Sequence, residues 1–344
     1  MKSEIIKFLA CPICSKELKP VSFEEDEEMK NGVLVCSSCK IVYPVYDYVP
    51  RLFVFPLPEY SEFKNKWKDK LKKIGCEFAN GTPEKGEQFI QRSFSIQWLE
   101  KDYDDYIWGF DPARLRAHVL KQIGFKEKEF AGKIAVDIGC GNGSITNLFF
   151  QFGAEAIGLD LSYSVIKSAQ HFRKNKKIHF VQASLFHPPF KKKIFDIVYS
   201  TGVLHHTYDT RKAFFSIVGL CKNKGRVYIW LYGDYKGFVK IFNIVTDSIR
   251  KVVSRLPPTI QDVTTKALAT FYGFAHTYLR KYFMKTPSVK YNKNQLLHTV
   301  RDRFTPVYAH IHKSSDVMEW FAEAGLKNMT LVEEQGLSIR ADKI

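Results

Sequence analysis

The sequence predicts an α/β fold: a doubly wound parallel sheet with a small metal-binding ribbon in front of it and a helical insert near its end. Three observations predict this fold. A short apolar run at 133–138 leads into a glycine-rich turn and then into a helical pattern at 145–152. A second apolar strand, 156–160, ends in an acidic residue. Two Cys-x-x-Cys pairs stand close together near the N-terminus.

Composition excludes several classes of protein. The chain has 344 residues and a formal net charge of +16, with 45% hydrophobic and 26% charged residues. These values are ordinary for a globular protein and exclude disordered, collagen-like and disulfide-knot chains. The length predicts two domains, or one large domain with an appendage. The longest uncharged apolar run, 267–279, is too short to span a bilayer, and the first residues lack the pattern of a signal peptide. We therefore expect a cytoplasmic protein with reduced thiols.

Residues 1–53 predict a separate zinc ribbon. Cys11 and Cys14 form one pair, and Cys36 and Cys39 form the other. The two-residue spacer lets both sulfurs of a pair reach one tetrahedral Zn²⁺, and two pairs complete a closed, structural four-thiolate site. A unit of this size cannot build an adequate core, so the metal would supply folding energy. The alternative is four unrelated structural cysteines. The three remaining cysteines are scattered and are expected to be inert thiols: Cys76, Cys140 and Cys221.

The ends of this ribbon carry a family resemblance. The ribbon begins with Leu-Ala-Cys-Pro at 9–12, and its last part contains Tyr-Pro at 43–44 followed by Val-Pro-Arg-Leu at 49–52. This pattern resembles the zinc-ribbon family that includes the small activator subunit of tRNA and rRNA methyltransferases. The resemblance implies a methyltransferase context.

The glycine-rich turn at 139–143 follows the first predicted strand of the sheet. Its spacing is Gly-x-Gly-x-Gly, and Ser144 stands where a dinucleotide-binding turn would have its third glycine. Asp137, directly before the turn, suits a ligand with a cationic group better than a pyrophosphate. Asp160 ends the next strand, where a carboxylate can accept hydrogen bonds from both hydroxyls of a ribose.

Several motifs together resemble the class I S-adenosylmethionine-dependent methyltransferases, most closely the type 11 group that includes quinone C-methylases. The motifs, in chain order, lie at 137–143, 158–162, 180–184, 195–200 and 202–207. The resemblance implies a seven-stranded Rossmann-like methyltransferase sheet within 132–344, closed by a helix at 314–325 and two strands from 329 onward. The alternative is another doubly wound enzyme, such as a dehydrogenase.

By this resemblance, seven residues would bind S-adenosylmethionine: Asp137, Gly139, Gly141, Gly143, Asp160, Leu161 and Ser184. The glycines would line the methionine end, and Asp137 would hold the loop and the amino group. Asp160 would bind the ribose, with Leu161 beside the adenine. Ser184 departs from the family pattern, because relatives often carry Asp there for the adenine amino group.

His205 and His206 follow the fourth strand and are the candidate catalytic residues. Methyl transfer from a sulfonium is an in-line displacement, and the cofactor carries the reactive group. A base is needed only if the acceptor atom must lose a proton, and His is the natural base at neutral pH. The alternative is that one His packs and caps while the other orients the loop.

Two further segments are expected to shape substrate choice. Residues 54–131 are helical in pattern and rich in aromatic residues, such as the pair Phe94 and Trp98, whose spacing favours core packing. This segment is expected to cover the cofactor as a lid. The insert, 233–303, is strongly basic: 235–303 holds 13 Lys and Arg against three Asp, a net charge of +10. That charge favours an anionic partner, although a solvated helix face is the alternative.

The sequence thus predicts a methyltransferase whose substrate is a small molecule or is lipid-linked, quinone-like or a glycan precursor, with anionic character. Apolar and basic residues mix at 238–245 and at 249–253, which include Arg250 and Lys251, as they would on a peripheral membrane surface. RNA is less favoured, because Ser-Thr-Gly-Val at 200–203 replaces the tetrapeptide of many base-amino methylases. The alternatives are a tRNA or rRNA methyltransferase and a non-catalytic scaffold of the same fold.

Overall fold

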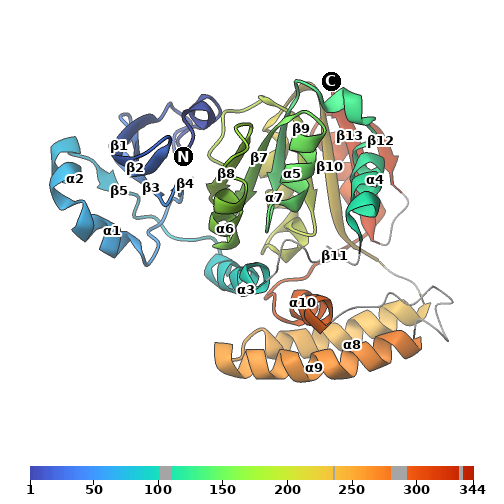
Figure 1. Ribbon diagram of the computed structural model, residues 1–344. Coiled ribbons are helices and arrows are strands. Elements are labelled where there is room, and N and C mark those ends of the chain that lie inside the picture. The colour runs from blue at the N-terminus through green and yellow to red at the C-terminus, as the bar shows by residue number, and fades with distance from the viewer. Residues whose placement is uncertain (101–109, 235–236, 280–292, 333–335) are drawn as a thin grey trace.

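The computed structural model describes residues 1–100, 110–234, 237–279, 293–332 and 336–344. The molecule has three parts (Figure 1): a small ribbon at the N-terminus, a large sheet with helices on both faces, and a layer of helices below the sheet. None of the helices in the described ranges combines the length and the hydropathy that crossing a bilayer requires.

The large sheet has the predicted doubly wound order. Its strands are β6 (Ile134–Ile138), β7 (Glu155–Asp160), β8 (Ile178–Gln182), β9 (Phe195–Thr201), β10 (Cys221–Gly233), β12 (Leu326–Leu331) and β13 (Leu337–Lys343). They lie in the order β12-β13-β10-β9-β6-β7-β8, and only β13 runs antiparallel to its two neighbours. The sequence did not predict β11 (Ile311–His312), which pairs with the end of β10 and makes an eighth strand.

Helices cover both faces of this sheet because each carries one apolar face. Val119 of α4 (Pro112–Ile123) and Phe149 of α5 (Ser144–Gln151) are fully buried in one core cluster. Phe214 of α7 (Thr210–Val218) and Phe321 of α11 (Ser314–Glu323) are fully buried in the other. The shorter helices are η1 (Ser3–Lys7), η2 (Glu127–Phe130), α6 (Ser164–His171) and η3 (Leu204–His206).

The ribbon is built on a sheet of its own. Its strands are β1 (Lys19–Glu25), β2 (Met29–Cys36), β3 (Ile41–Tyr46), β4 (Val49–Pro50) and β5 (Glu77–Phe78). Because β5 pairs with β3, the ribbon sheet takes in chain from beyond residue 53. Helices α1 (Tyr60–Lys66) and α2 (Lys68–Ile74) pack on this sheet through Phe63 and Leu71.

The ribbon covers the β8 edge of the large sheet. The backbone N–H of Leu52 donates to the carbonyl of Gln182 in β8 at 2.9 Å, and that of Ala10 donates to Pro189 at 3.0 Å. One apolar core runs through both parts and includes Leu9 of the ribbon. An open sheet edge is a template for unwanted pairing, so this cover protects it.

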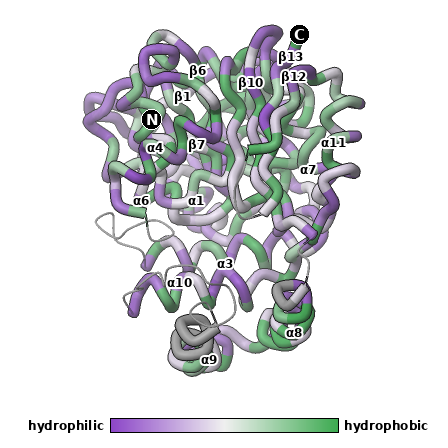
Figure 2. The backbone as a smooth tube through the Cα atoms, turned by 90° about the vertical axis from the view of Figure 1, so that its right-hand side faces the viewer, coloured by the Kyte–Doolittle hydropathy of each residue, from purple (hydrophilic) through white to green (hydrophobic). Residues whose placement is uncertain are grey.

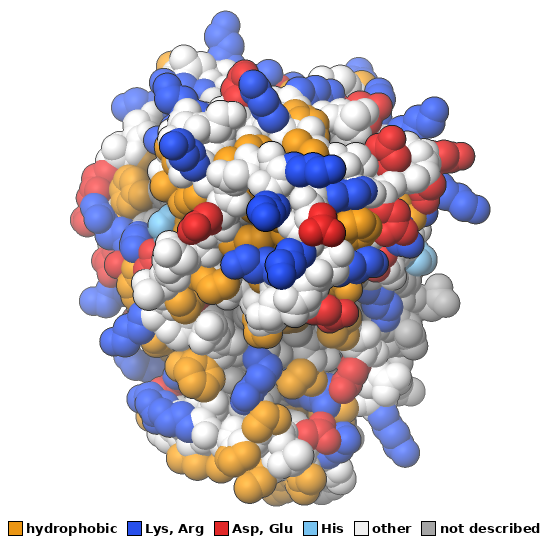
Figure 3. Space-filling view, turned by 90° about the vertical axis from the view of Figure 1, so that its left-hand side faces the viewer, with side chains coloured by type: hydrophobic (Ala, Val, Ile, Leu, Met, Phe, Trp, Pro, Cys, Tyr) orange, Lys and Arg blue, Asp and Glu red, His pale blue; other side chains and the backbone are white. Residues whose placement is uncertain are grey.

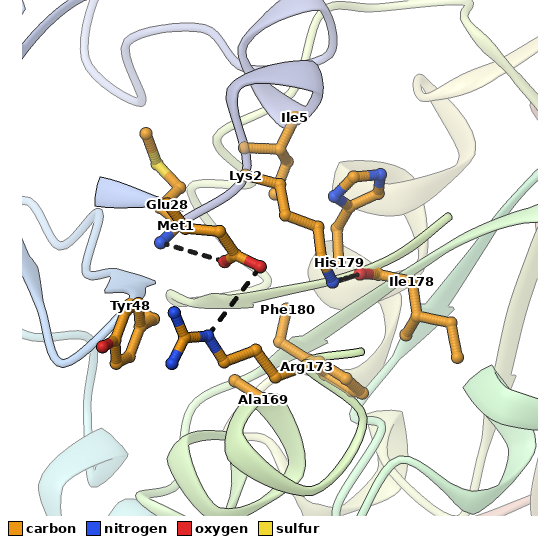
Figure 4. Close-up of a pocket in the computed structure, with 10 residues that line it drawn as sticks. All are labelled: Met1, Lys2, Ile5, Glu28, Tyr48, Ala169, Arg173, Ile178, His179 and Phe180. Atoms are coloured by element: carbon orange, nitrogen blue, oxygen red, sulfur yellow. Dashed lines mark hydrogen bonds and ion pairs between the residues drawn. The ribbon is translucent and has the colours of Figure 1, made fainter. Parts of the chain in front are cut away.

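Charged side chains line the interface between the ribbon and the β8 edge of the large sheet (Figure 4). The Lys2 ammonium donates to the carbonyl of Ile178 at 2.8 Å, and burial lowers the pKa of this lysine. Arg173 on the α6 side approaches the ribbon's Glu28 at 3.9 Å. Arg173 also donates to Asp26 at 2.6 Å. The ribbon is thus fixed to the sheet by specific polar contacts as well as by apolar packing.

The insert forms the lowest layer of the molecule and confirms the predicted helical insert (Figure 1). It consists of α8 (Gly237–Val253), α9 (Pro258–Leu279) and α10 (Lys293–Phe304). Val253, Ala269, Val300 and Phe304 form a small core that joins the three helices. On its other side α10 contacts α3 (Glu87–Leu99), which lies directly under the large sheet.

Candidate active site

The four cysteines of the ribbon come together as a metal site. Their sulfur atoms all lie within 4.8 Å of one another, and the sulfurs of Cys14 and Cys36 are 3.5 Å apart. A tetrahedron of Zn–S bonds places sulfurs about 3.8 Å apart, so the four thiols Cys11, Cys14, Cys36 and Cys39 fit one Zn²⁺. The buried hydroxyl of Tyr43 lies 3.1 Å from the Cys11 sulfur, an outer contact that the sequence did not reveal.

The turn after β6 requires glycine for two reasons: its backbone has positive φ angles, and neighbouring side chains leave no room for a Cβ atom. The φ angles of Gly139, Gly141 and Gly143 are 76°, 53° and 76°. A Cβ on Gly139 would lie 2.2 Å from the Val203 side chain, and one on Gly141 would lie 2.9 Å from the Trp98 ring. The glycines therefore let the Val203 and Trp98 side chains pack directly against the backbone of the turn.

Asp160, the last residue of β7, ties the turn to the next loop. One carboxylate oxygen accepts from the backbone N–H of Gly141 at 2.8 Å, and the other accepts from Ser162 at 2.7 Å. Burial raises the pKa of Asp160. The Ser162 side chain and the Leu161 backbone also contact this carboxylate, so the hydroxyls of a ribose would share its acceptor positions with these groups.

Asp137 lies at the end of β6 beside the same turn. Its carboxylate accepts a hydrogen bond from the hydroxyl of Thr146 at 2.7 Å. Burial is the main cause that raises its pKa to about 7, although the Thr146 bond acts in the opposite direction. A cationic group bound beside Asp137 would favour the charged carboxylate.

Helix α3 lies across the carboxyl ends of β7 and β8 with a polar face toward them. Its contacts recur at one-turn intervals: Glu87 with the Ser184 side chain, Gln91 with the carbonyl of Leu161 at 3.0 Å, and Ser95 with the N–H of Tyr163 at 3.0 Å. Burial raises the pKa of Glu87, although its contact with Ser184 acts the other way. The helix therefore places a buried carboxyl group at the position where Ser184 departs from the family pattern.

The aromatic pair on α3 faces the site. Trp98 lies against Gly141, and Phe94, one turn earlier, lies 5.3 Å from the ring of His206. The sequence favoured simple core packing for this pair, but here the two rings cover the glycine turn and a candidate catalytic residue.

His206 is held in one tautomer. Its Nδ1 lies 2.8 Å from the carbonyl oxygen of Tyr308, which can only accept, so Nδ1 carries the proton. Nε2 therefore bears a lone pair, and it has no hydrogen-bond partner among the described residues. Burial lowers the pKa of His206, so the ring is neutral at pH 7.

His205 differs from its neighbour. Its ring stacks on Tyr232 at 4.0 Å and lies 5.7 Å from Trp230, and the whole side chain is buried. Burial lowers its pKa well below the ordinary value. Neither ring nitrogen has a hydrogen-bond partner within the described part of the chain. The His205 ring is thus held by packing against aromatic side chains, whereas the His206 ring is oriented by a hydrogen bond.

The seven predicted cofactor residues therefore gather at the carboxyl ends of three adjacent strands, β6, β7 and β8. Sequence reasoning missed Glu87, Gln91 and Tyr308, which come from segments outside the recognised motifs. For Glu87 and Gln91 one signal existed: both stand at helical spacing on the helix that carries Phe94 and Trp98. Tyr308 acts through its backbone carbonyl, which no sequence pattern reveals.

Comparisons with known proteins agree with this geometry. A methyltransferase-domain family model matches residues 136–229, and a Trm112p-like protein model matches residues 2–47. An uncharacterised protein of Methanocaldococcus jannaschii is 30% identical over 44% of this chain and 70% of its own length. A ubiquinone biosynthesis O-methyltransferase of Pelagibacter ubique is 33% identical over 29% of this chain and 44% of its own length.

One solved structure of similar fold is magnesium protoporphyrin IX methyltransferase from Synechocystis with bound S-adenosylhomocysteine. It is 14% identical, covers 75% of this chain and 99% of its own, and has a TM-score of 0.44. The chain belongs to the class I S-adenosylmethionine-dependent methyltransferases, and its N-terminal part is a Trm112p-like zinc ribbon. It spans less than half the length of the ubiquinone enzyme that it matches.

Proposed function

We propose that this methyltransferase acts on a small molecule, one that is lipid-linked, quinone-like or a glycan precursor and carries an anionic group. The observation that carries the proposal is the enclosure of the site on its α3 side. Phe94 and Trp98 cover the carboxyl end of the sheet, and His206 and Tyr232 stand behind them with ring centroids 5.5 Å apart. A flat apolar acceptor fits such walls better than a folded nucleic acid does.

The cofactor roles follow from the contacts around the turn. S-adenosylmethionine, when bound, supplies an activated methyl group for in-line displacement. Asp160 would hold the ribose and Asp137 the amino group, while the bare backbone of the turn faces the methionine part. Leu161 would lie beside the adenine, with Ser184 and Glu87 near its amino group. Bound in this way, the methyl donor is oriented and shielded from water by α3.

A second candidate, an RNA methyltransferase, is favoured by one observation. The Trm112p-like ribbon resembles an activator subunit of tRNA and rRNA methyltransferases, and here it is joined to the enzyme within one chain. The name of the Pelagibacter relative, ubiquinone biosynthesis O-methyltransferase, supports the small-acceptor proposal instead. The strongly basic insert is compatible with either acceptor.

Methyl-labelled S-adenosylmethionine tests the substrate class directly. The full chain is incubated with labelled cofactor and host extract, which is then separated into lipid, RNA and water-soluble fractions. Label in the lipid or small-molecule fraction is the expected result. Label in RNA would replace the proposal by the second candidate.

His206 is expected to matter more for turnover than His205. We propose that the lone pair of His206 Nε2 accepts the proton that the acceptor loses. Loss of a general base typically costs about 10²–10⁴-fold in rate, so His206→Gln should lower kcat by that range. His205→Gln, which removes a packed aromatic neighbour, should alter stability more than kcat.

Because burial lowers the pKa of His206, kcat should be level above pH 7 and fall only below the ordinary His range near 6.5. Equal kcat losses in the two variants would contradict this assignment.

Cofactor affinity is expected to depend on pH through Asp137. The pKa of this carboxyl is raised to about 7 in the free enzyme, and a bound ammonium group would lower it. Binding should therefore release a proton near pH 7, and affinity for S-adenosylhomocysteine should weaken as the pH falls below 7. Calorimetry in buffers of different ionisation enthalpy measures the released proton. In Asp137→Asn the proton release should disappear, and its persistence would assign the release to another group.

A further inference from the structure

The outer face of the insert is apolar, although its sequence is highly charged. The described part of the chain exposes fifteen large hydrophobic side chains, and eight of them lie on α8 and α9. Figure 3 shows hydrophobic side chains gathered with Lys and Arg at the bottom of the molecule, where these two helices lie. The eight residues are Ile241, Ile244, Val245, Ile249, Val252, Ile260, Val263 and Phe271. We call this set the apolar stripe.

The stripe is a continuous face of each helix. On α8 its members stand at 241, 244, 245, 249 and 252, and on α9 they stand at 260, 263 and 271, which are three and eight residues apart. Such spacing places them on one side of a helix. Figure 2 shows α8 as a largely hydrophobic helix in the lowest layer. Val263 and Phe271 are 68% and 71% exposed, so no other described part of the chain covers them.

The polar side of α8 faces inward. Arg250, which the sequence placed on the membrane side, is only 6% exposed. It donates to Asp247 at 2.6 Å and to the carbonyl of Pro306 at 2.9 Å. Thr246 is buried as well and accepts a hydrogen bond from Arg303 of α10 at 2.8 Å. The helix therefore buries its polar contacts and presents its apolar face to the outside, the reverse of an ordinary surface helix.

The exposed charges that border the stripe are basic. The exposed basic residues are Lys240 and Lys251 on α8, Arg255 just after α8, and Lys266 on α9. The two acidic residues in the described part of these helices, Asp247 and Asp262, are half-buried. Each pairs with an exposed lysine, Lys251 or Lys266, and also with an inward-facing arginine, so the basic residues outnumber the acidic ones. The outer face thus combines apolar side chains with positive charge.

We infer that the outer face of α8 and α9 binds an anionic lipid membrane in its interfacial layer. Aliphatic side chains would enter the acyl boundary while the flanking cations meet lipid phosphates. A second copy fits less well, because pairing the same face with itself would bring like charges together. RNA fits less well too, because seven of the eight stripe residues are Ile or Val and only Phe271 offers an aromatic surface on which a base can stack.

This surface would turn the α3 side of the active site toward the membrane, with α10 between them. Helix α10 packs against α8 and α9 on one side and against α3 on the other, and α3 covers the glycine turn. Ser93 of α3 and Thr305, just after α10, share a hydrogen bond of 2.6 Å. A lipid-linked acceptor would therefore have to pass α10 and α3 to reach the site from the bilayer surface. The membrane inference extends the proposed function. It rests on that function for the assumption that the methyl acceptor is lipid-linked.

Vesicle sedimentation of the full chain tests the inference. We expect the protein to sediment with vesicles that contain phosphatidylglycerol and to bind pure phosphatidylcholine vesicles more weakly. The double variant Ile244→Asp with Val263→Asp, one change on each helix, should bind at least about tenfold more weakly. The matched control is Leu331→Asp with Met318→Asp, which alters two exposed apolar residues on other elements and should bind like the unchanged protein.

The other outcomes separate the two proposals. Binding of S-adenosylhomocysteine and an unchanged melting temperature show that each variant is folded. If the unchanged protein ignores anionic vesicles, or if the stripe variant binds them normally, the membrane inference is wrong. If the stripe variant instead dissociates a dimer or loses RNA binding, the face serves a different partner and the inference is also overturned. Vesicle binding without any methylated lipid or small molecule would refute the proposed substrate class and leave the membrane inference standing.

Discussion

The variant Cys36→Ser is expected to lose the metal and to unfold the ribbon. Binding of a structural Zn²⁺ is worth about 10–16 kcal/mol in small zinc domains, which equals or exceeds the whole stability of a typical domain. Cys36 is fully buried among the four sulfurs, so water cannot readily replace its thiolate. Metal analysis should find well under one zinc per chain in the variant and one in the unchanged protein.

The effect should reach the methyltransferase sheet. The ribbon covers the β8 edge through the Leu52 to Gln182 hydrogen bond, and both parts share one apolar core. Losing several kcal/mol of this support should lower the melting temperature by about 10 °C or more. The control is Cys76→Ser, because Cys76 is half-buried and lies outside the four-sulfur cluster. If Cys36→Ser keeps its zinc and melts like the Cys76 variant, the four thiols are not a metal site.

The parts of the structure that are local in sequence could be predicted. The glycine turn, Asp160 after the second strand and the two Cys pairs each place their chemistry within a few residues of a strand or turn, so spacing alone locates them. The strand order also follows once the motifs are recognised, because connections in doubly wound sheets obey strict rules.

The contacts between distant segments could not be predicted. The partner of the His206 ring is a backbone carbonyl of Tyr308, about a hundred residues away, and backbone groups leave no pattern in a sequence. The sequence also did not show which face of α8 is turned inward. Its apolar and polar faces are equally regular, and only tertiary contacts decide which of them is buried. Arg250 shows this clearly: a basic residue in a basic insert is expected at the surface, yet three backbone and side-chain acceptors hold it inside.

Asp160→Ala is expected to abolish useful affinity for the cofactor. We propose that the carboxylate of Asp160 accepts both ribose hydroxyls, and a hydrogen bond to a charged group contributes about 1.5–3 kcal/mol. Losing two such bonds should weaken binding of S-adenosylhomocysteine by a hundredfold or more, since about 1.4 kcal/mol corresponds to each tenfold change. The same substitution releases the Gly141 N–H, which now donates to this carboxylate at 2.8 Å, so the glycine turn should also become less ordered.

Isothermal calorimetry with S-adenosylhomocysteine measures this loss, and a matched control is available in the same sheet. Asp196 lies at the opposite end of the strands, in β9, where its carboxylate accepts from the Ile134 N–H at 2.9 Å. Asp196→Ala removes a comparable backbone contact away from the glycine turn, so it should lower stability while cofactor affinity stays within a few-fold. Similar affinities of the two variants for S-adenosylhomocysteine would show that Asp160 has only a structural role and does not bind the cofactor. A large loss confined to Asp160→Ala would support a ribose bound at the carboxyl end of β7, where the Asp160 carboxylate already accepts from the Gly141 N–H of the turn.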